Sequence, residues 1–299
     1  MRARPALAAL AILVIGWLWP WLARAAPEIN VLVSEPTGIY QETAASLTQS
    51  LSRYGWKMTL STPERYMANG SDLTVAIGTR ALEKALAQPA RPVLSLLVPR
   101  LSYERLAAGQ SQVSALYLDQ PLTRQLQLLG LALPDLKTAG VPLGPSSQVL
   151  VAALQSAAKA SGVQTDIVPV NQGSDLYAAL TELARDSQAF LLLPDPVVAQ
   201  RSSLQSFFLH TYRLRKPVLA YSAPLVQSGA LLGLYATPEQ LGEEAAGWIR
   251  ESWSKGAFRL GASRYPRRYT IGVNRTVAQS LEIELPGADV LNRQLEAMQ

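Results

Sequence analysis

The stretch LTVAIGT, residues 73–79, ends an apolar run in Gly78-Thr79, and a helix-like segment with Arg80 in its first turn follows at once. A helix N-terminus presents unpaired N–H groups and a partial positive charge, so this turn has the chemistry to hold an anion. An ordinary joint between a strand and a helix, with Thr79 as the N-cap, explains the same residues. Taken alone, the motif favours the ordinary joint.

Residue types that carry out catalysis are scarce. The chain has no cysteine and a single histidine, His210, in the apolar stretch SFFLHTY, where a packed histidine is expected. The common zinc sites and thiol chemistry are therefore excluded. No G-x-S-x-G, P-loop or G-x-G-x-x-G motif occurs, so the sequence indicates neither a serine hydrolase of that type nor a nucleotide site.

Carboxylates stand at three expected strand ends, as Glu35, Asp119 and Asp195. Two of them could form the acid pair of a glycosidase. Each fits a cap or a turn better, and Asp195 lies between two prolines in LPDPVV. We therefore predict a protein that binds without catalysing, with no metal and no cofactor.

The elements that position these residues alternate along the chain. In the first part, apolar runs at 29–33, 73–77, 93–97 and 113–118 alternate with helical patterns at 39–54, 80–87 and 121–133. After residue 137 the pattern restarts, with strands expected at 138–143, 163–170, 189–193, 217–221, 229–235 and 269–273 and helices at 149–160, 175–185, 203–214 and 238–253. Apolar strands separated by helices predict parallel sheets covered on both faces. The restart favours an α/β fold of two Rossmann-like, doubly wound lobes over one large sheet.

In such sheets, ligands bind at the carboxyl ends of the strands, where loops run into helix N-termini. The residues at these expected positions are mostly small hydroxyl residues, with glycine and carboxylates among them. We therefore predict a ligand-binding cleft lined by hydroxyl and N–H groups. Its candidate residues are Ser34, Glu35, Gly78, Thr79, Ser146, Ser147, Asp195, Tyr221 and Ser222.

Residues 1–25 have the features of a secretory signal peptide. Arg2 and Arg4 precede the apolar stretch 6–22, and Ala23-Arg24-Ala25 offers small residues for cleavage after Ala25. A retained membrane anchor is the alternative, because the stretch approaches the length of a minimal span. The remaining 274 residues (299 − 25) are enough for two lobes. Since no cysteine is present for a lipid anchor, we expect a freely diffusing periplasmic protein.

The charge of the chain gives no support for nucleic-acid binding. The net charge of +5 falls to +2 (5 − 3) when Arg2, Arg4 and Arg24 leave with the signal peptide. The segment 196–238 contains basic residues but no Asp or Glu. It is either a solvated surface or a face for an acidic partner.

Three long segments resemble one family of ABC-transporter substrate-binding proteins, related to tryptophan- or tyrosine-type uptake systems. These segments are ALYLDQPLTRQLQLLGLALPDLKTAGVPLGPSS, AYSAPLVQSGALLGLYATPEQLGEEAAGWI and RRYTIGVNRTVAQSLEIELPGADVLNR. Together with TVAIGTRALEKAL they occur in the family's order, and residues 29–54 fit the family's first strand and helix. The resemblance covers essentially the whole mature chain. The resemblance rests on order and spacing rather than on a single sharp motif.

The resemblance implies a type I periplasmic-binding-protein fold, in which two lobes joined by three crossings close on a solute like a hinge. Residues 26–136 plus 226–258 would form lobe 1, and residues 137–225 plus 259–299 would form lobe 2. A small-molecule ligand and an inner-membrane ABC permease are the implied partners. A monomer is expected.

The resemblance also implies roles for the candidate residues. Thr79 and the backbone after Gly78 would lie on one wall, and Ser146 and Ser147 on the other would hold a carboxylate. Asp195 would be the candidate for an amine. The pocket would also be lined by Tyr221 or Ser222.

Three departures leave the ligand open. The first turn is SEPTGIYQ, PDPVV lacks the Asp-Asn pair of amino-acid-binding members, and SLEIELP has glutamate where glycine is usual. We therefore expect a periplasmic protein that captures a small polar or amino-acid-like solute for an ABC importer. The alternative is a sensory or accessory binder that presents a solute to a membrane receptor or sensor kinase.

Overall fold

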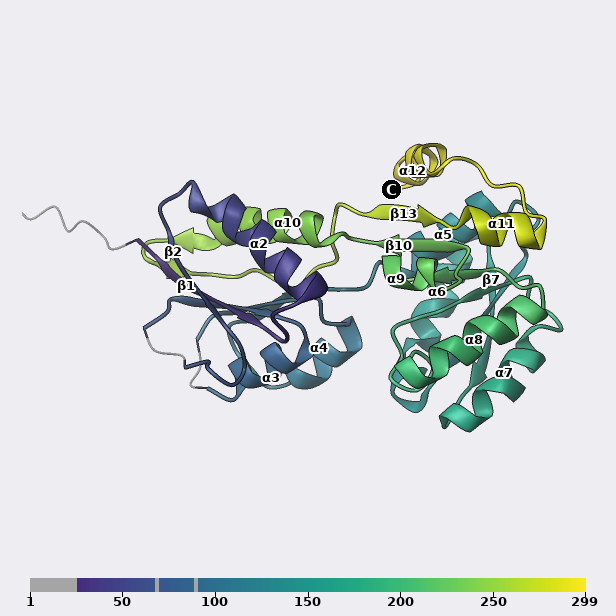
Figure 1. Cartoon of the computed structure of the whole chain (residues 1–299), viewed down its shortest axis with the longest axis horizontal. Coiled ribbons are helices and arrows are strands. Elements are labelled where there is room, and N and C mark those ends of the chain that lie inside the picture. The colour runs from purple at the N-terminus through teal and green to yellow at the C-terminus, as the bar shows by residue number, and fades with distance from the viewer. Residues whose placement is uncertain (1–25, 68–69, 89–90) are drawn as a thin grey trace, which may run out of the picture.

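The computed structural model describes residues 26–67, 70–88 and 91–299, and the chain forms two α/β halves side by side (Figure 1). The predicted signal peptide, residues 1–25, lies outside the described residues. Among the described residues, no helix combines the length and the apolar character needed to cross a bilayer.

The first half contains a parallel five-stranded sheet in the order β2-β1-β3-β4-β5. Its strands are β1 (Glu28–Val33), β2 (Lys57–Ser61), β3 (Leu73–Ile77), β4 (Val93–Leu96) and β5 (Val113–Leu116). Its helices are α2 (Gly38–Ser52), α3 (Thr79–Leu86), α4 (Arg100–Leu106) and α10 (Pro238–Ser252). The apolar faces of α2 and α10 pack on Ile29, Val31 and Val33 of β1 in one core. Strand β2 was not expected from the sequence, because its residues are mostly polar or exposed.

The second half contains a six-stranded sheet in the order β13-β10-β9-β8-β6-β7. Its strands are β6 (Thr138–Leu143), β7 (Gln164–Pro169), β8 (Ala189–Leu191), β9 (Val218–Ala220), β10 (Leu232–Tyr235) and β13 (Thr270–Val273), with β13 antiparallel to β10. Its helices are α5 (Leu122–Ala132), α6 (Val151–Ser161), α7 (Leu176–Leu183), α8 (Arg201–Arg213), α9 (Ala223–Gln227), α11 (Arg275–Leu281) and α12 (Ala288–Glu296), with short 3₁₀ turns η1 (Pro145–Leu150) and η2 (Gly173–Asp175). The doubly wound α/β architecture predicted from the sequence is thus confirmed.

Two elements lie in a different half from the one expected. The predicted boundaries at residues 136 and 226 put α5 and β10 in the first lobe. In the structure, Leu126 and Leu129 of α5 share a core with Val141 of β6, and β10 pairs with β9 and β13. The physical reason is that the apolar faces of α5 and β10 are buried only against the second sheet.

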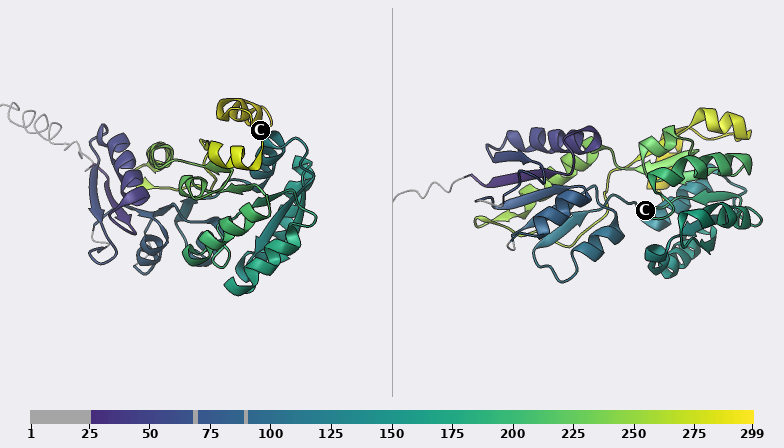
Figure 2. Two further views of the ribbon diagram at one scale, coloured as in Figure 1. Left: turned by 45° about the vertical axis from the view of Figure 1, so that its right-hand side comes forward. Right: turned by 60° about the horizontal axis from the view of Figure 1, so that its bottom comes forward.

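The chain therefore crosses between the halves at residues 117–121, at residues 236–237 and at residues 259–269, the last after the short strands β11 (Trp253–Ser254) and β12 (Ala257–Phe258). The third crossing runs beside β5: Arg264 forms a parallel bridge with Leu116, and its N–H donates to the carbonyl of Ala115 at 2.8 Å. The right view of Figure 2 shows the segments that join the two halves.

Candidate ligand-binding cleft

The carboxyl ends of parallel strands from both sheets approach each other where the chain crosses between the halves. A cavity of about 30 Å³ lies there, lined by residues that follow β4, β5, β6 and β8. We call it the cleft cavity. It has room for about one water molecule. The polar side chains that line it belong to Arg100, Asp119, Gln120, Gln125, Ser147 and Tyr265.

Asp119 is the partly buried carboxyl group of the cleft cavity. Burial raises its pKa to about 6, although the hydrogen bonds that it accepts act in the opposite direction. Its Oδ2 accepts a hydrogen bond from the backbone N–H of Arg100, the first residue of α4, at 2.5 Å. It forms no ion pair within the described residues. A partly buried carboxylate that forms no salt bridge is suited to bind a cationic group of a ligand.

Two buried glutamines beside Asp119 have unsatisfied polar atoms. Gln120 and Gln125 are each 2% exposed. The side chain of Gln125 donates to the carbonyl of Gln120 at 2.8 Å, and that of Gln120 accepts from Arg124 at 2.6 Å. Gln120 Nε2 and Gln125 Oε1 have no hydrogen-bond partner in the part of the chain that the structure describes. Because both side chains line the cleft cavity, these atoms are available to a ligand or to water.

Tyr221, in the second half, lies near Asp119 and Asp195. Burial is the main cause that raises its pKa to about 12, and the nearby carboxylates of Asp119 and Asp195 add to it. The phenol is therefore neutral at physiological pH and can donate a hydrogen bond. Ser222 next to it occupies the N-cap position of α9 without capping the helix through its side chain.

Ser34 and Gly78 contact each other at the carboxyl ends of β1 and β3. The Oγ of Ser34 accepts a hydrogen bond from the backbone N–H of Ala81 at 3.0 Å, so it satisfies a donor in the first turn of α3. Gly78 has φ +92°, and a Cβ there would lie 2.5 Å from Ser34 Oγ. The helix begins at Thr79, with Gly78 as its N-cap. The capping hydrogen bond therefore comes from the side chain of Ser34 and not from Thr79, the residue that the sequence indicated.

Thr79 is partly exposed as the first residue of α3, and its hydroxyl forms no hydrogen bond among the described residues. Arg80 extends to solvent and pairs with Glu64 at 3.0 Å. Glu35 is exposed. The pKa of Tyr40 is raised by burial and by Glu35 and is lowered by Arg201 of α8, so groups from both halves lie near Tyr40.

On the opposite wall, the 3₁₀ turn after β6 separates its two serines. Ser147 is 1% exposed and lines the cleft cavity, and its N–H donates to the carbonyl of Gly144 at 3.0 Å. Ser146 is exposed and does not line the cleft cavity. Of the two, only Ser147 faces the place where the halves meet.

Asp195 has a different environment from the one its expected role requires. Its carboxylate is 2% exposed and accepts hydrogen bonds from the backbone N–H groups of Gly144, Val197 and Val198, at 2.8, 2.7 and 2.9 Å. These three hydrogen bonds satisfy the carboxylate, and the one from Gly144 connects the end of β8 to the end of β6. Asp195 therefore holds two strand ends together, and Asp119 is the better candidate for an amine.

In the sequence, Asp119 stands out only as a strand-end carboxylate, and Arg100, Gln120, Gln125 and Tyr265 are not predicted as residues of the site. A signal was present in LDQPLTRQ, residues 118–125, where Gln125 lies in a helix whose neighbouring leucines are buried. A buried glutamine at such a position indicates a polar cavity.

His210 is remote from the cleft cavity. Its Nε2 lies 3.0 Å from the Thr181 hydroxyl, and its ring stacks on Tyr177. Burial lowers its pKa, so the imidazole is neutral at pH 7. The described residues contain no cluster of three or more His, Cys, Asp or Glu side chains arranged for a metal.

Comparison with known proteins identifies the family. The model of the family described as ABC transporter substrate binding protein matches residues 57–288. The chain belongs to this family. No curated protein sequence matches this substrate-binding protein.

Solved structures show the same fold. The ABC domain from Streptococcus pneumonia in complex with L-Trp is 19% identical, with a TM-score of 0.64 over 89% of this chain and 98% of that chain. CD0873, a substrate binding protein with adhesive properties from Clostridium difficile, in its ligand-free, open structure, is 20% identical, with a TM-score of 0.67 over 88% of this chain and 97% of that chain. A conserved domain protein from Vibrio cholerae is 20% identical, with a TM-score of 0.63 over 89% and 97%. This substrate-binding protein therefore has the type I fold, and its family role is solute binding for an ABC transporter.

Proposed function

We propose that this member of the family works in the periplasm, where it captures a small polar or amino-acid-like solute between its halves and delivers it to the permease of an ABC importer. The apolar segment 6–22 after Arg2 and Arg4 supports export, and the lack of cysteine supports a protein without a lipid anchor. The protein acts as a monomer and catalyses no reaction. Neither the family nor the solved relatives favour the sensory alternative.

The observation that carries the choice of ligand is the cleft cavity. Asp119 supplies a carboxylate without an ion-pair partner among the described residues, and the unsatisfied side-chain atoms of Gln120 and Gln125 lie on the same lining. Tyr221 adds a neutral hydroxyl from the second half. The ammonium group of a solute satisfies this set, and because the cleft cavity has room for about one water molecule, the rest of the solute lies outside it.

An anionic group of the same solute would be held further along the two walls. Thr79 presents a hydroxyl at the N-terminus of α3, and Ser147 presents one after β6. A helix N-terminus favours an anion. The solute would thus contact both halves, and it stabilises the closed state by binding that state more tightly than the open one.

The first test is thermal unfolding of residues 26–299 with amino acids, amines and small anions. A ligand at a hundred times its Kd stabilises the fold by about 2.7 kcal/mol, which raises Tm by a few degrees. We expect one class of amine-bearing solutes to do so. The panel is repeated after unfolding and refolding, which removes a ligand that co-purifies.

Variants then test the site. Asp119→Asn should weaken binding at least tenfold, and Thr79→Ala combined with Ser147→Ala should weaken it by about 2–4 kcal/mol, at about 1–2 per lost charged hydrogen bond. Asp135→Asn, at an exposed position of the second half, is the control and should bind normally. Unchanged affinity in both cleft variants would rule out this site.

A further inference from the structure

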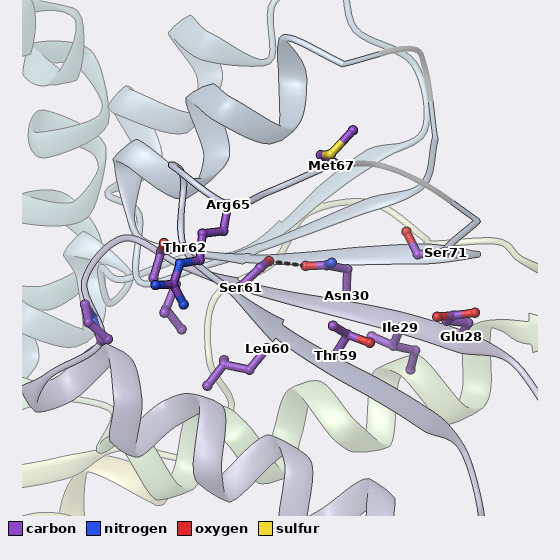
Figure 3. A pocket seen from close by; sticks show the side chains of 12 residues that line it. Glu28, Ile29, Asn30, Thr59, Leu60, Ser61, Thr62, Arg65, Met67 and Ser71 are labelled. Carbon is purple, nitrogen blue, oxygen red and sulfur yellow. Dashed lines mark hydrogen bonds between the residues drawn. The ribbon is translucent and has the colours of Figure 1, made fainter.

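A second cavity, of about 480 Å³, lies on the first half and shares no lining residue with the cleft cavity. It runs along β1 and β2, from Glu28 and Ser71 at one end to Thr62 and Arg65 at the other (Figure 3). We call it the β1–β2 pocket. Its volume falls in the range typical of sites for small ligands.

The pocket exists because one sheet face is incompletely covered there. Helices α2 and α10 cover one face of the sheet, and α3 and α4 pack on the other face over β3, β4 and β5. The connection from β2 to β3, residues 62–72, contains no helix in its described part. On this face, a loop instead of a helix covers the outer strands β1 and β2, which leaves space between the loop and the sheet.

The floor of the pocket is polar. Asn30 interrupts the apolar strand EINVLV and is 8% exposed, although a parallel strand covered on both faces normally presents apolar side chains. Thr59 pairs with it in register on β2. The hydroxyl of Ser61 donates to Asn30 Oδ1 at 2.6 Å, as the dashed line in Figure 3 shows. This bond holds the carboxamide at the floor of the pocket.

Ser71 contributes a buried hydroxyl at one end of the pocket. The residue is 5% exposed, and its Oγ has no hydrogen-bond partner within the described residues. Its position is fixed, because its carbonyl accepts a hydrogen bond from the guanidinium of Arg91 at 2.8 Å. A buried hydroxyl without a partner costs free energy, so a ligand that satisfies it gains affinity.

The charges of the pocket differ between its ends. Glu28 forms an ion pair with Lys57 at 2.9 Å, which balances its charge. Arg65, at the other end, forms no ion pair with a described residue, and its side chain extends from the loop toward the sheet (Figure 3). The pocket therefore offers one cation near its mouth and a row of neutral hydroxyl and amide groups along its floor.

We propose that the β1–β2 pocket binds a small hydroxylated carboxylic acid of the sugar-acid type. The carboxylate pairs with Arg65, and the hydroxyl groups exchange hydrogen bonds with Asn30, Ser61 and Ser71. Met67, which is 67% exposed, covers the carbon skeleton. The site acts independently of the cleft, so it does not depend on the function proposed above.

Titration calorimetry of residues 26–299 with gluconate tests this proposal. We expect saturable binding with one site per chain. Arg65→Gln should weaken it at least tenfold, Ser71→Ala three- to tenfold, and Asn30→Leu, which replaces the amide by an apolar group of similar size, should abolish it. Circular dichroism checks that Asn30→Leu folds, and Ser71→Ala carries the test if it does not.

Controls separate this site from general charge and from the cleft. Arg105→Gln removes an exposed arginine of the same half, and Asp119→Asn changes the cleft; both should bind gluconate like the unmodified protein. Glucose and inorganic phosphate should bind at least tenfold more weakly than gluconate. Absence of saturable binding, equal binding of glucose or phosphate, or loss of binding in Asp119→Asn would overturn the proposal.

Discussion

The carboxylate of Asp195 accepts a hydrogen bond from the backbone N–H of Gly144 at 2.8 Å, which joins the ends of β8 and β6. The two residues fit so closely that a Cβ at position 144 would lie 2.5 Å from Asp195 Oδ1. The turn that carries Ser147 starts at this contact. The position of one wall of the cleft therefore depends on a carboxylate that is itself saturated with protein donors.

Asp195→Ala should destabilise the second half. Three backbone N–H groups lose their acceptor, and a buried unsatisfied donor costs about 1–3 kcal/mol, so we expect a total loss of about 3–5 kcal/mol in the free energy of unfolding. Urea unfolding measures it. The exposed Asp135→Ala is the control and should change stability by less than about 0.5 kcal/mol. A loss below about 1 kcal/mol for Asp195→Ala would show that these hydrogen bonds do not hold the strand ends.

Gly78→Ala should destabilise the first half by about 2–4 kcal/mol. The φ of +92° is strained for alanine, and its Cβ would lie 2.5 Å from Ser34 Oγ and 2.6 Å from the ring of Tyr40. Gly247→Ala in α10 is the matched control, because a Cβ there contacts nothing within 4 Å. The control should gain up to about 1 kcal/mol from helix propensity. Urea unfolding midpoints that shift in the same direction for the two variants would contradict this.

Ser34→Ala should cost about 0.5–2 kcal/mol, because the N–H of Ala81 loses its cap. Ser222→Ala is the comparison: Ser222 also stands at a helix start, but its side chain makes no capping hydrogen bond. That variant should unfold at the same urea concentration as the unmodified protein. Equal destabilisation of both variants would show that the Ser34 side chain does not act as a helix cap.

Asp119 should make stability depend on pH. Its folded-state pKa of about 6 lies above the ordinary value of 3.8, so the folded state binds the proton more tightly than the unfolded state. Acidification from pH 7 to pH 4 therefore stabilises the fold through this group, by roughly 2 kcal/mol at about 1.4 kcal/mol per pKa unit. The Asp119→Asn variant lacks this stabilisation at low pH. The difference in unfolding free energy between the two proteins, measured across this range, should follow that change, while the effect of His210 cancels because both proteins contain it. A difference that does not vary with pH would contradict the assignment.

Protonation of Asp119, which stabilises the fold, should weaken ligand binding. If an ammonium group binds the Asp119 carboxylate, protonation removes its partner, so the affinity should fall by up to tenfold for each pH unit below about 6. Calorimetry at pH 7 and pH 5 measures this. The Asp119→Asn variant should show a flat profile, and a flat profile in the unmodified protein would exclude Asp119 from the ligand contacts.

Much of the fold was predictable from the sequence, because it rests on local periodicity. The run at 73–77 and the helix after it lie where the apolar pattern indicated. Strand β2 was missed because only one of its sides contacts the core. The half to which α5 belongs could not be predicted, since its leucines fit either core equally well and only the three-dimensional packing decides.

The candidate site was predictable in place but not in role. Strand ends carry polar residues in both halves, and Gly78 and Ser147 lie at them as expected. Whether a carboxylate is free or saturated depends on contacts distant in sequence, such as the Asp195 to Gly144 bond across 51 positions. Residue type and local spacing contain no information on such contacts, so the sequence favoured Asp195 over Asp119.

The packing of α10 on α2 has a consequence for biosynthesis. The hydroxyl of Ser46 donates to the carbonyl of Glu239, 193 positions away, and Gly242 lets the two helices meet, since a Cβ there would lie 2.6 Å from Ser46 Cβ. The N-terminal sheet cannot bury its apolar face until the ribosome has delivered most of the chain. Contacts so distant in sequence also slow folding. The first half of the nascent chain thus completes its core only after α10 has been synthesised.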